Sequence, residues 1–151
     1  MLGFFRKPSI EERQHADALK QIVREILGLA DAVTVSVSEI QCGDASCPGT
    51  ETVILVLSEM SRTPRLNGQN GKDHWPVTSA MVIGGGVRGG RAYGGTTNGL
   101  EARPIDLATG DAVATGGTLQ TNQLAAGVLE LCGADPAPWF PGVEALRGFH
   151  A

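Results

Sequence analysis

The sequence predicts an α/β or α+β fold, with an N-terminal helix, a mixed sheet of about four to five strands and a C-terminal helix packed on that sheet. Three observations predict it. Two segments, 9–28 and 118–133, carry apolar residues at three- and four-residue spacing, as amphipathic helices do. Short β-branched runs bounded by glycine and proline lie between them. The 151 residues suit one domain, or two very small ones.

The first element is a helix that begins after Ser9 and ends at Gly28. Ser9 and Glu12 have the spacing of a capping box, in which each side chain bonds the other residue's backbone N–H. Gly28 can adopt the left-handed conformation that ends helices. The apolar stripe that should face the sheet consists of Leu19, Ile22, Val23 and Ile26.

Three strands follow, in the segments 32–40, 52–57 and 77–83. "AVTVSVSEI" alternates apolar and polar residues, which is typical of a strand with one buried face. "TVILVL" is continuously apolar, as in a strand covered on both faces. "VTSAMVI" follows a long loop, and "RAYGGTT", residues 91–97, could pair with it. The second helix ends the regular part, with Leu124, Val128 and Leu131 on one face and Gly133 as its cap.

The glycine run after the third strand resembles a nucleotide-binding fingerprint in spacing only. Gly84, Gly86 and Gly89 satisfy G-x-G-x-x-G, but that fingerprint needs a helix after its third glycine. Further glycines follow instead, so the sequence predicts a β-turn. Arg88 and Arg91 flank this turn, and two interpretations stay open: a weak anion site or a solvated pair.

Three potential metal ligands lie near the ends of two strands. Glu59 follows the apolar strand, and Asp73 and His74 precede the next one. Carboxylates and imidazole suit Zn²⁺ or a similar divalent ion. From spacing alone, a metal site and an ordinary polar surface cluster both stay open.

A longer stretch carries a family resemblance. "TVILVLSEMSRTPRLNGQNGKDHWPVTSAMVIGGGVRGGRAYGGT" and the later "FPGVEAL" are similar to the C-terminal region of a bacterial family in the alkaline phosphatase/sulfatase superfamily, over residues 52–149. That family is abundant in planctomycetes and usually exported. Met60 and Ser61 stand where it has Phe-Gly. The resemblance implies that Glu59 and His74, and less firmly Asp73, match the region that supplies late metal ligands, with Zn²⁺ as the expected kind of cofactor.

The same resemblance implies that the chain is not an enzyme. Hydrolases of this superfamily need an early Asp ligand and a Ser, Thr or Cys nucleophile from an N-terminal half, whereas residues 1–56 loosely resemble a different, small bacterial α/β domain. We therefore expect a chimera-like chain: a helix-strand-strand module over 1–57, joined to or merged with a hydrolase-like fragment over 52–151. We expect no catalytic residues. The alternative is a small protein-interaction or structural α/β module without metal function.

Composition limits the partners and the location. A net charge of −4 with scattered basic residues argues against nucleic acid. No apolar run is long enough for a transmembrane helix, and "MLGFFRKPS" is too short for a signal peptide, so we expect no membrane contact and a cytoplasmic location. The apolar strand 52–57 needs cover on both faces, which a homo-oligomer could supply. The sequence does not specify a small-molecule ligand.

The three cysteines do not form a disulfide framework. Cys42 and Cys47 are separated by four residues in a turn, so free thiols, a disulfide under oxidising conditions and a partial metal site all stay open, in that order. Cys132 lies on the apolar face of a helix and should be a buried small hydrophobe. His150 is expected to be disordered at the chain end.

Overall fold

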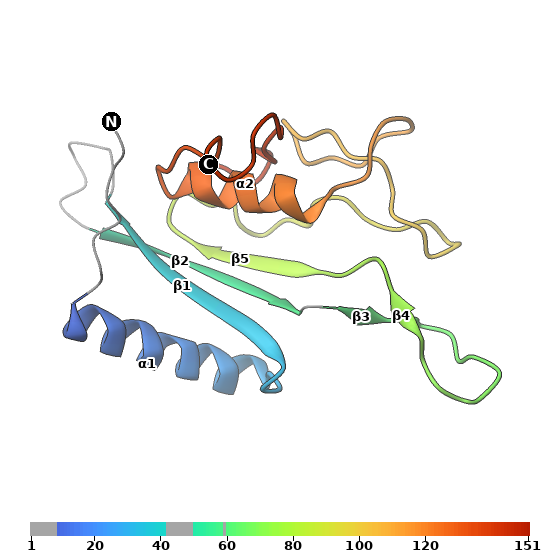
Figure 1. Cartoon of the computed structure of the whole chain (residues 1–151), viewed down its shortest axis with the longest axis horizontal. Coiled ribbons are helices and arrows are strands. Elements are labelled where there is room, and N and C mark those ends of the chain that lie inside the picture. The colour runs from blue at the N-terminus through green and yellow to red at the C-terminus, as the bar shows by residue number, and fades with distance from the viewer. Residues whose placement is uncertain (1–8, 42–49, 59) are drawn as a thin grey trace.

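The computed structural model describes residues 9–41, 50–58 and 60–151 and has an α+β fold (Figure 1). Helix α1 lies on one side of the sheet and helix α2 on the other. The elements, in chain order, are α1 (Ile10–Leu27), β1 (Val33–Gln41), β2 (Thr50–Ser58), β3 (Ser61–Arg62), β4 (His74–Trp75), β5 (Ala80–Gly84) and α2 (Thr121–Leu131).

The described strands form two separate antiparallel groups, where the sequence predicts one mixed sheet. A three-stranded sheet has the order β1-β2-β5, and β3 pairs only with β4. Antiparallel pairing of β1 and β2 is expected because only eight residues separate them, whereas parallel neighbours need a crossover of about a dozen residues or more. The expected partner strand over 91–97 does not form, since that segment holds only an isolated bridge between Thr96 and Ala102.

Helix α1 begins and ends where the sequence predicts. The Ser9 hydroxyl accepts from the Glu12 backbone N–H at 3.1 Å, and the Glu12 carboxylate accepts from the Ser9 N–H at 2.6 Å. Gly28 is left-handed, with φ of 60°. The predicted apolar stripe is only partly covered, because Ile22 and Ile26 are 49% and 76% exposed. No residue of this helix is fully buried.

Strand β2 lies at the centre of the sheet and is buried from both faces, as its continuous apolar run predicts. Val56 pairs with Val35 of β1 and Met81 of β5, so these three side chains share the face toward α1. Val53 points to the opposite face, the one covered by α2, and is only 2% exposed. The apolar run is therefore needed because each face of β2 meets a different layer.

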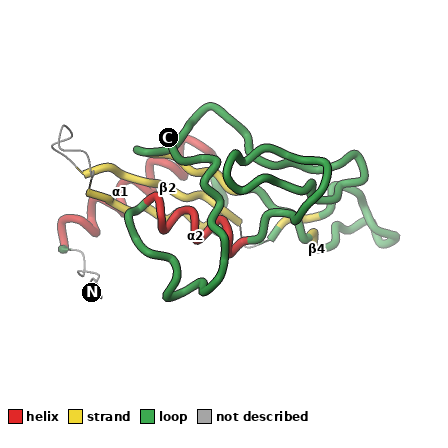
Figure 2. The backbone as a smooth tube through the Cα atoms, turned by 90° about the horizontal axis from the view of Figure 1, so that it is seen from above, coloured by secondary structure: helices red, strands yellow, loops and turns green. Residues whose placement is uncertain are grey.

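The main hydrophobic cluster is formed by residues of β5, α2 and the long loops. These loops lie on the same side of the sheet as α2 (Figure 2). Ile105, Leu146 and Phe149 form its buried centre, at 6%, 2% and 3% exposure. The partly buried residues packed around them are Val82, Tyr93, Leu107, Leu119, Leu124, Val128 and Leu131. The predicted inner face of α2 is thus confirmed, and Gly133 follows the helix with φ of 72°.

The C-terminal segment is ordered, so the expectation of a disordered His150 is wrong. Its ring Nε2 lies 2.9 Å from the Gly127 carbonyl oxygen, and its ring meets Phe149 edge-on. The Ala151 N–H donates to the Gly86 carbonyl at 2.8 Å. The last residues are held in place because Phe149, which precedes His150, is a residue of the hydrophobic core.

The glycine run forms a turn, as the sequence predicts. Gly84 and Gly86 have φ of 142° and 68°, and a Cβ at Gly84 would collide with the Thr52 carbonyl of the neighbouring strand. No helix follows within the next thirty residues of the described chain. In the described residues, neither helix is both long and apolar enough to cross a lipid bilayer.

An ion pair joins α2 to the C-terminal segment. Arg147 donates from Nε and Nη2 to the two carboxylate oxygens of Glu130, each at 2.7 Å. The hydrogen bonds and charge of Arg147 hold the pKa of Glu130 below its ordinary value, against a smaller opposing effect of burial.

We expect this pair to make stability depend on acid pH. A carboxyl whose pKa is lower in the folded state stabilises the fold above its unfolded pKa, about 4.3 for Glu, and this contribution disappears as pH falls through the folded value. Urea unfolding of Glu130→Gln measured from pH 6 to pH 3 should therefore give a flatter stability profile than the parent. Glu101→Gln removes an exposed carboxylate and should leave the profile unchanged. Equal slopes in the parent and Glu130→Gln would contradict the assignment.

Candidate functional site

Two of the predicted metal ligands, Asp73 and His74, lie at the end of the molecule formed by β3, β4 and the loop between them. The loop is organised by Asn67, whose side-chain oxygen accepts from the N–H groups of Gln69 and Gly71 at 3.0 and 2.9 Å. The Thr63 N–H donates to the Asp73 carbonyl at 2.9 Å and closes the base of the loop. The two-residue strands therefore hold this loop in a fixed shape.

Asp73 has a structural partner within the loop. Its Oδ1 accepts from the Asn67 side-chain amide at 2.8 Å, and its backbone N–H donates to the Thr63 hydroxyl at 3.2 Å. Its side chain is exposed and does not line the pocket that contains its neighbour, His74. Asp73 and His74 are thus adjacent in the chain but are not directed at one common point.

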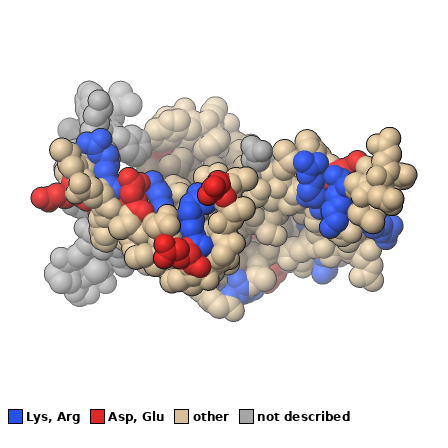
Figure 3. Space-filling model, turned by 90° about the horizontal axis from the view of Figure 1, so that it is seen from below, with Lys and Arg blue, Asp and Glu red and all other residues tan. Residues whose placement is uncertain are grey.

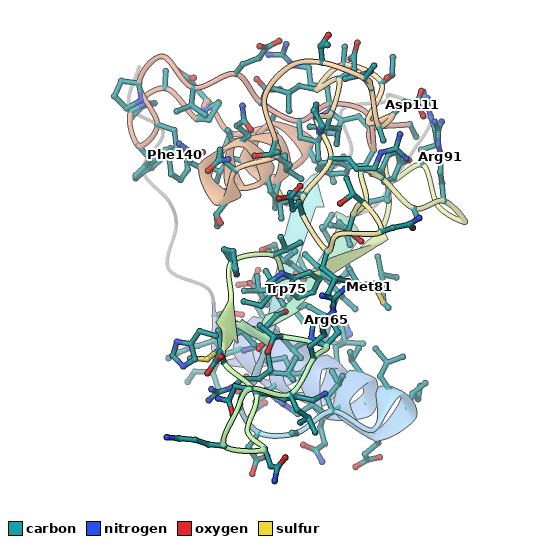
Figure 4. The ribbon with its side chains drawn as sticks, turned by 90° about the vertical axis from the view of Figure 1, so that its right-hand side faces the viewer. Arg65, Trp75, Met81, Arg91, Asp111 and Phe140 are labelled. Atoms are coloured by element: carbon teal, nitrogen blue, oxygen red, sulfur yellow. The ribbon has the colours of Figure 1, made fainter. Side chains whose placement is uncertain are left out.

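His74 lines a shallow pocket of about 410 Å³ between the β3–β4 ladder and the start of α2. Its other lining residues are Met60, Trp75, Pro76, Thr78 and Thr121. Trp75 is fixed there because its indole N–H donates to the Leu100 carbonyl at 3.1 Å (Figure 4 shows it in the middle of the molecule). Thr121 is the first residue of α2, where backbone N–H groups lack partners within the helix and carry partial positive charge.

Sequence reasoning missed most of this pocket. Thr121 lies 47 positions after His74 in the chain, and no local pattern connects the two. A strand of two residues is also too short to produce a periodic signal. The one available signal was the Trp beside the His, because a buried indole usually finds a hydrogen-bond partner.

The third predicted ligand, Glu59, lies outside the described residues, as do Cys42 and Cys47. Within the described ranges, no group of three or more His, Cys, Asp or Glu side chains could hold a metal ion. Cys132 is half-buried, and burial raises the pKa of its thiol. That environment fits the predicted role of a small hydrophobe, because a thiol with a raised pKa is less reactive.

Basic side chains gather around the same loop. Figure 3 shows lysine and arginine atoms at this end of the molecule, while basic and acidic groups are mixed over the rest of that face. The loop and its flanks carry Arg62, Arg65 and Lys72, all exposed. Arg62 is oriented by donating to the Lys72 carbonyl at 3.2 Å. Residues 61–75 therefore carry three basic side chains against one acidic side chain, Asp73, although the net charge of the chain is −4.

The two arginines of the glycine turn have different environments. Arg91 forms an ion pair with Asp111, and its guanidinium carbon lies 5.4 Å from the centre of the Tyr93 ring (Figure 4). Arg88 is exposed, and its backbone N–H donates to the Phe149 carbonyl at 2.8 Å. The positive charge of Arg91 is thus partly neutralised within the chain.

A second shallow pocket, of about 430 Å³, lies beside the C-terminal segment. It is lined by Ile105, Asp106, Leu107, Ala108, Gly117, Gln123 and Glu144. The Asp106 carboxylate accepts from the N–H groups of Ala108 and Thr109 at 2.8 and 3.0 Å, which is a turn-forming arrangement. The Asp106 carboxylate therefore stabilises this turn.

Comparison with known protein families gives a match. The model of a family described as "Protein of unknown function (DUF1501)" matches residues 48–147, about two thirds of the chain. The matched part includes β2, the candidate pocket, α2 and most of the hydrophobic cluster. No curated protein and no solved structure matches the chain. The chain therefore belongs to the DUF1501 family, whose function is unknown.

Proposed function

We propose that this chain is a non-catalytic binding module related to hydrolases of the alkaline phosphatase/sulfatase superfamily. In this proposal it weakly holds a small oxyanion such as phosphate or sulfate, or a divalent metal such as Zn²⁺ accompanied by an anion, beside His74. The supporting observation is that His74 lines a pocket with the first residue of α2, next to three basic residues of the adjoining loop.

Electrostatics in this region favour an anion over a bare cation. Arg62, Arg65 and Lys72 raise the local potential, and the N-terminus of α2 adds partial positive charge. A cation alone would be repelled, and Asp73 would have to leave Asn67 to bind it. A metal at His74 therefore needs an anionic co-ligand. Arg88 and Arg91 form at most a second anion site, which is weaker because Arg91 is paired with Asp111.

Thermal unfolding tests the oxyanion directly. Phosphate or sulfate at about ten times its Kd should stabilise the fold by roughly 1.4 kcal/mol, which raises the Tm by about 3–6 °C relative to chloride at equal ionic strength. His74→Ala should remove most of that rise. The matched control is His15→Ala, an exposed histidine on α1 that pairs with Glu39 at 3.2 Å and lies outside the pocket.

Two further measurements test the metal and the non-catalytic parts of the proposal. Zn²⁺ added with phosphate should raise the Tm beyond phosphate alone, and EDTA should reverse this increment. Assays with phosphate and sulfate esters in the presence of Zn²⁺ or Mn²⁺ should give no turnover. Turnover that disappears in His74→Ala would overturn the non-catalytic assignment, and identical anion responses in the parent and His74→Ala would overturn the site.

A second candidate function is an interaction module that binds no metal. Its support is an exposed apolar strand, in which Met81 and Ile83 of β5 are 47% and 41% accessible, together with the lack of a three-ligand group in the described residues. In this case neither Zn²⁺ nor a chelator should move the Tm. The same titration therefore separates the two candidates.

A further inference from the structure

We propose that strand β5 is the interface of a homodimer, in which the β5 strands of two copies pair antiparallel and join the two sheets into one of six strands. This inference rests on the second candidate function and names its partner as a second copy of this chain. Metal binding plays no part in it.

β5 is an edge strand without the usual protection. It pairs with β2 on one side, and the described residues provide no strand on its other side. Four of its five residues are exposed. Natural edge strands are normally blocked by charged side chains, proline or a covering element, because their free N–H and C=O groups attract other strands. Residues 77–87 contain neither a charged residue nor a proline.

The exposed side chains of β5 are apolar and lie on one face. Met81 and Ile83 point to the same face because they are two positions apart in a strand. Figure 4 shows Met81 directed outward. It lies on the α1 side of the sheet, at the edge away from the strand that α1 contacts. Helix α1 contacts β1, two strands away, and so leaves this face of β5 open.

The sequence of β5 is self-complementary about Val82. Antiparallel pairing of two copies around a two-fold axis at Val82 places Met81 opposite Ile83 of the second copy, and Ile83 opposite Met81 of the second copy. Four apolar side chains then form one cluster on the open face. Cross-strand pairs of this kind are the stabilising units of sheets. Each copy thus contributes the same surface to the interface, as two-fold symmetry requires.

The chain exposes 10392 Å², more than the roughly 7,300 Å² expected of a compact monomer of 15.7 kDa. Each partner of a standard interface buries about 800 Å², so surface beside β5 has to join the five residues of the strand in this interface.

The oligomeric state tests the proposal. Sedimentation velocity over a hundredfold range of concentration should show a mass of about twice 15.7 kDa at the upper end. Ile83→Lys places a charge in the apolar cluster and should weaken dimerisation at least tenfold. Leu66→Lys introduces the same charge at a residue that is 61% exposed in the β3–β4 loop, and should leave the dimer intact.

Hydrogen exchange locates the interface independently of folding. Amides within Ala80–Gly84 should become more protected as concentration rises in the parent and in Leu66→Lys, but not in Ile83→Lys, whose far-UV circular dichroism should match the parent. A monomer at every concentration would overturn the proposal. So would a dimer that survives Ile83→Lys, which would leave the interaction function standing but place the interface elsewhere. A chelator-sensitive Tm would instead count against the second candidate function itself.

Discussion

Replacing Gly127 by alanine should lower the free energy of unfolding by about 2 kcal/mol or more. Gly127 is a buried residue within α2, where alanine is normally better than glycine by about 1 kcal/mol. Here a Cβ would collide with the Leu146 carbonyl oxygen and lie 3.1 Å from the Phe149 ring. The expected change in the free energy of unfolding is therefore opposite in sign to the change that helix propensity alone predicts.

The clash cannot be relieved by a small adjustment. The Leu146 backbone is fixed because its N–H donates to the Gln123 carbonyl at 3.0 Å, on the same helix as Gly127. The His150 ring also contacts the Gly127 carbonyl. Alanine would thus push the C-terminal segment away from α2 and separate core residues, at the upper end of the typical overpacking cost of about 1–3 kcal/mol.

Urea unfolding followed by circular dichroism measures this effect. Gly89→Ala is the matched control, because a Cβ there has no heavy atom within 4 Å. That control should be neutral or stabilising by up to about 1 kcal/mol, since alanine restricts the unfolded chain. A Gly127→Ala protein as stable as the parent would show that the segment does not pack on α2 as described.

Phe149→Ala should have a still larger effect, a loss of about 3–5 kcal/mol. Phe149 is 3% exposed and forms the centre of the main cluster with Ile105 and Leu146. Its carbonyl also accepts from the Arg88 N–H at 2.8 Å, which ties the core to the turn after β5. Because native domains are stable by only about 5–15 kcal/mol, a loss of this size removes a large part of the free energy of unfolding.

Thermal unfolding and hydrogen exchange check this prediction together. The Tm should fall sharply or the transition should disappear, and the Arg88 amide should lose its protection. The control Leu66→Ala removes an apolar side chain that is 61% exposed and should change stability by less than about 0.5 kcal/mol. Equal losses in the two variants would mean that residue 149 is not a core position.

Local signals in the sequence predicted the two helices well. The Ser9–Glu12 box and Gly28 set the ends of α1 through contacts only a few residues apart. In α2, Leu124 and Val128 are on the inner face because the helix repeat fixes which residues meet the core. These features depend on short-range geometry, which the chain encodes directly.

Features that depend on distant contacts could not be predicted. From the sequence, Phe149 and His150 are expected to be part of an unstructured C-terminal end, because no nearby residue indicates that they pack against α2. Ile22 belongs to the predicted stripe yet is half exposed, since α1 contacts mainly β1, an edge strand of the sheet. The pairing of Asp73 with Asn67 likewise depends on the path of a whole loop.

The family match begins at residue 48, so its boundary falls between two paired strands of the sheet. β2 belongs to the matched part, whereas β1, which pairs with β2, precedes the matched part in the sequence. Main-chain hydrogen bonds between antiparallel strands do not depend on side-chain identity, and the outward positions Thr34, Ser36 and Ser38 are polar. Any alternating strand of similar length could therefore occupy that edge. Recombination at this boundary would exchange the leading helix and strand as a cassette while preserving the pocket and the core beyond it.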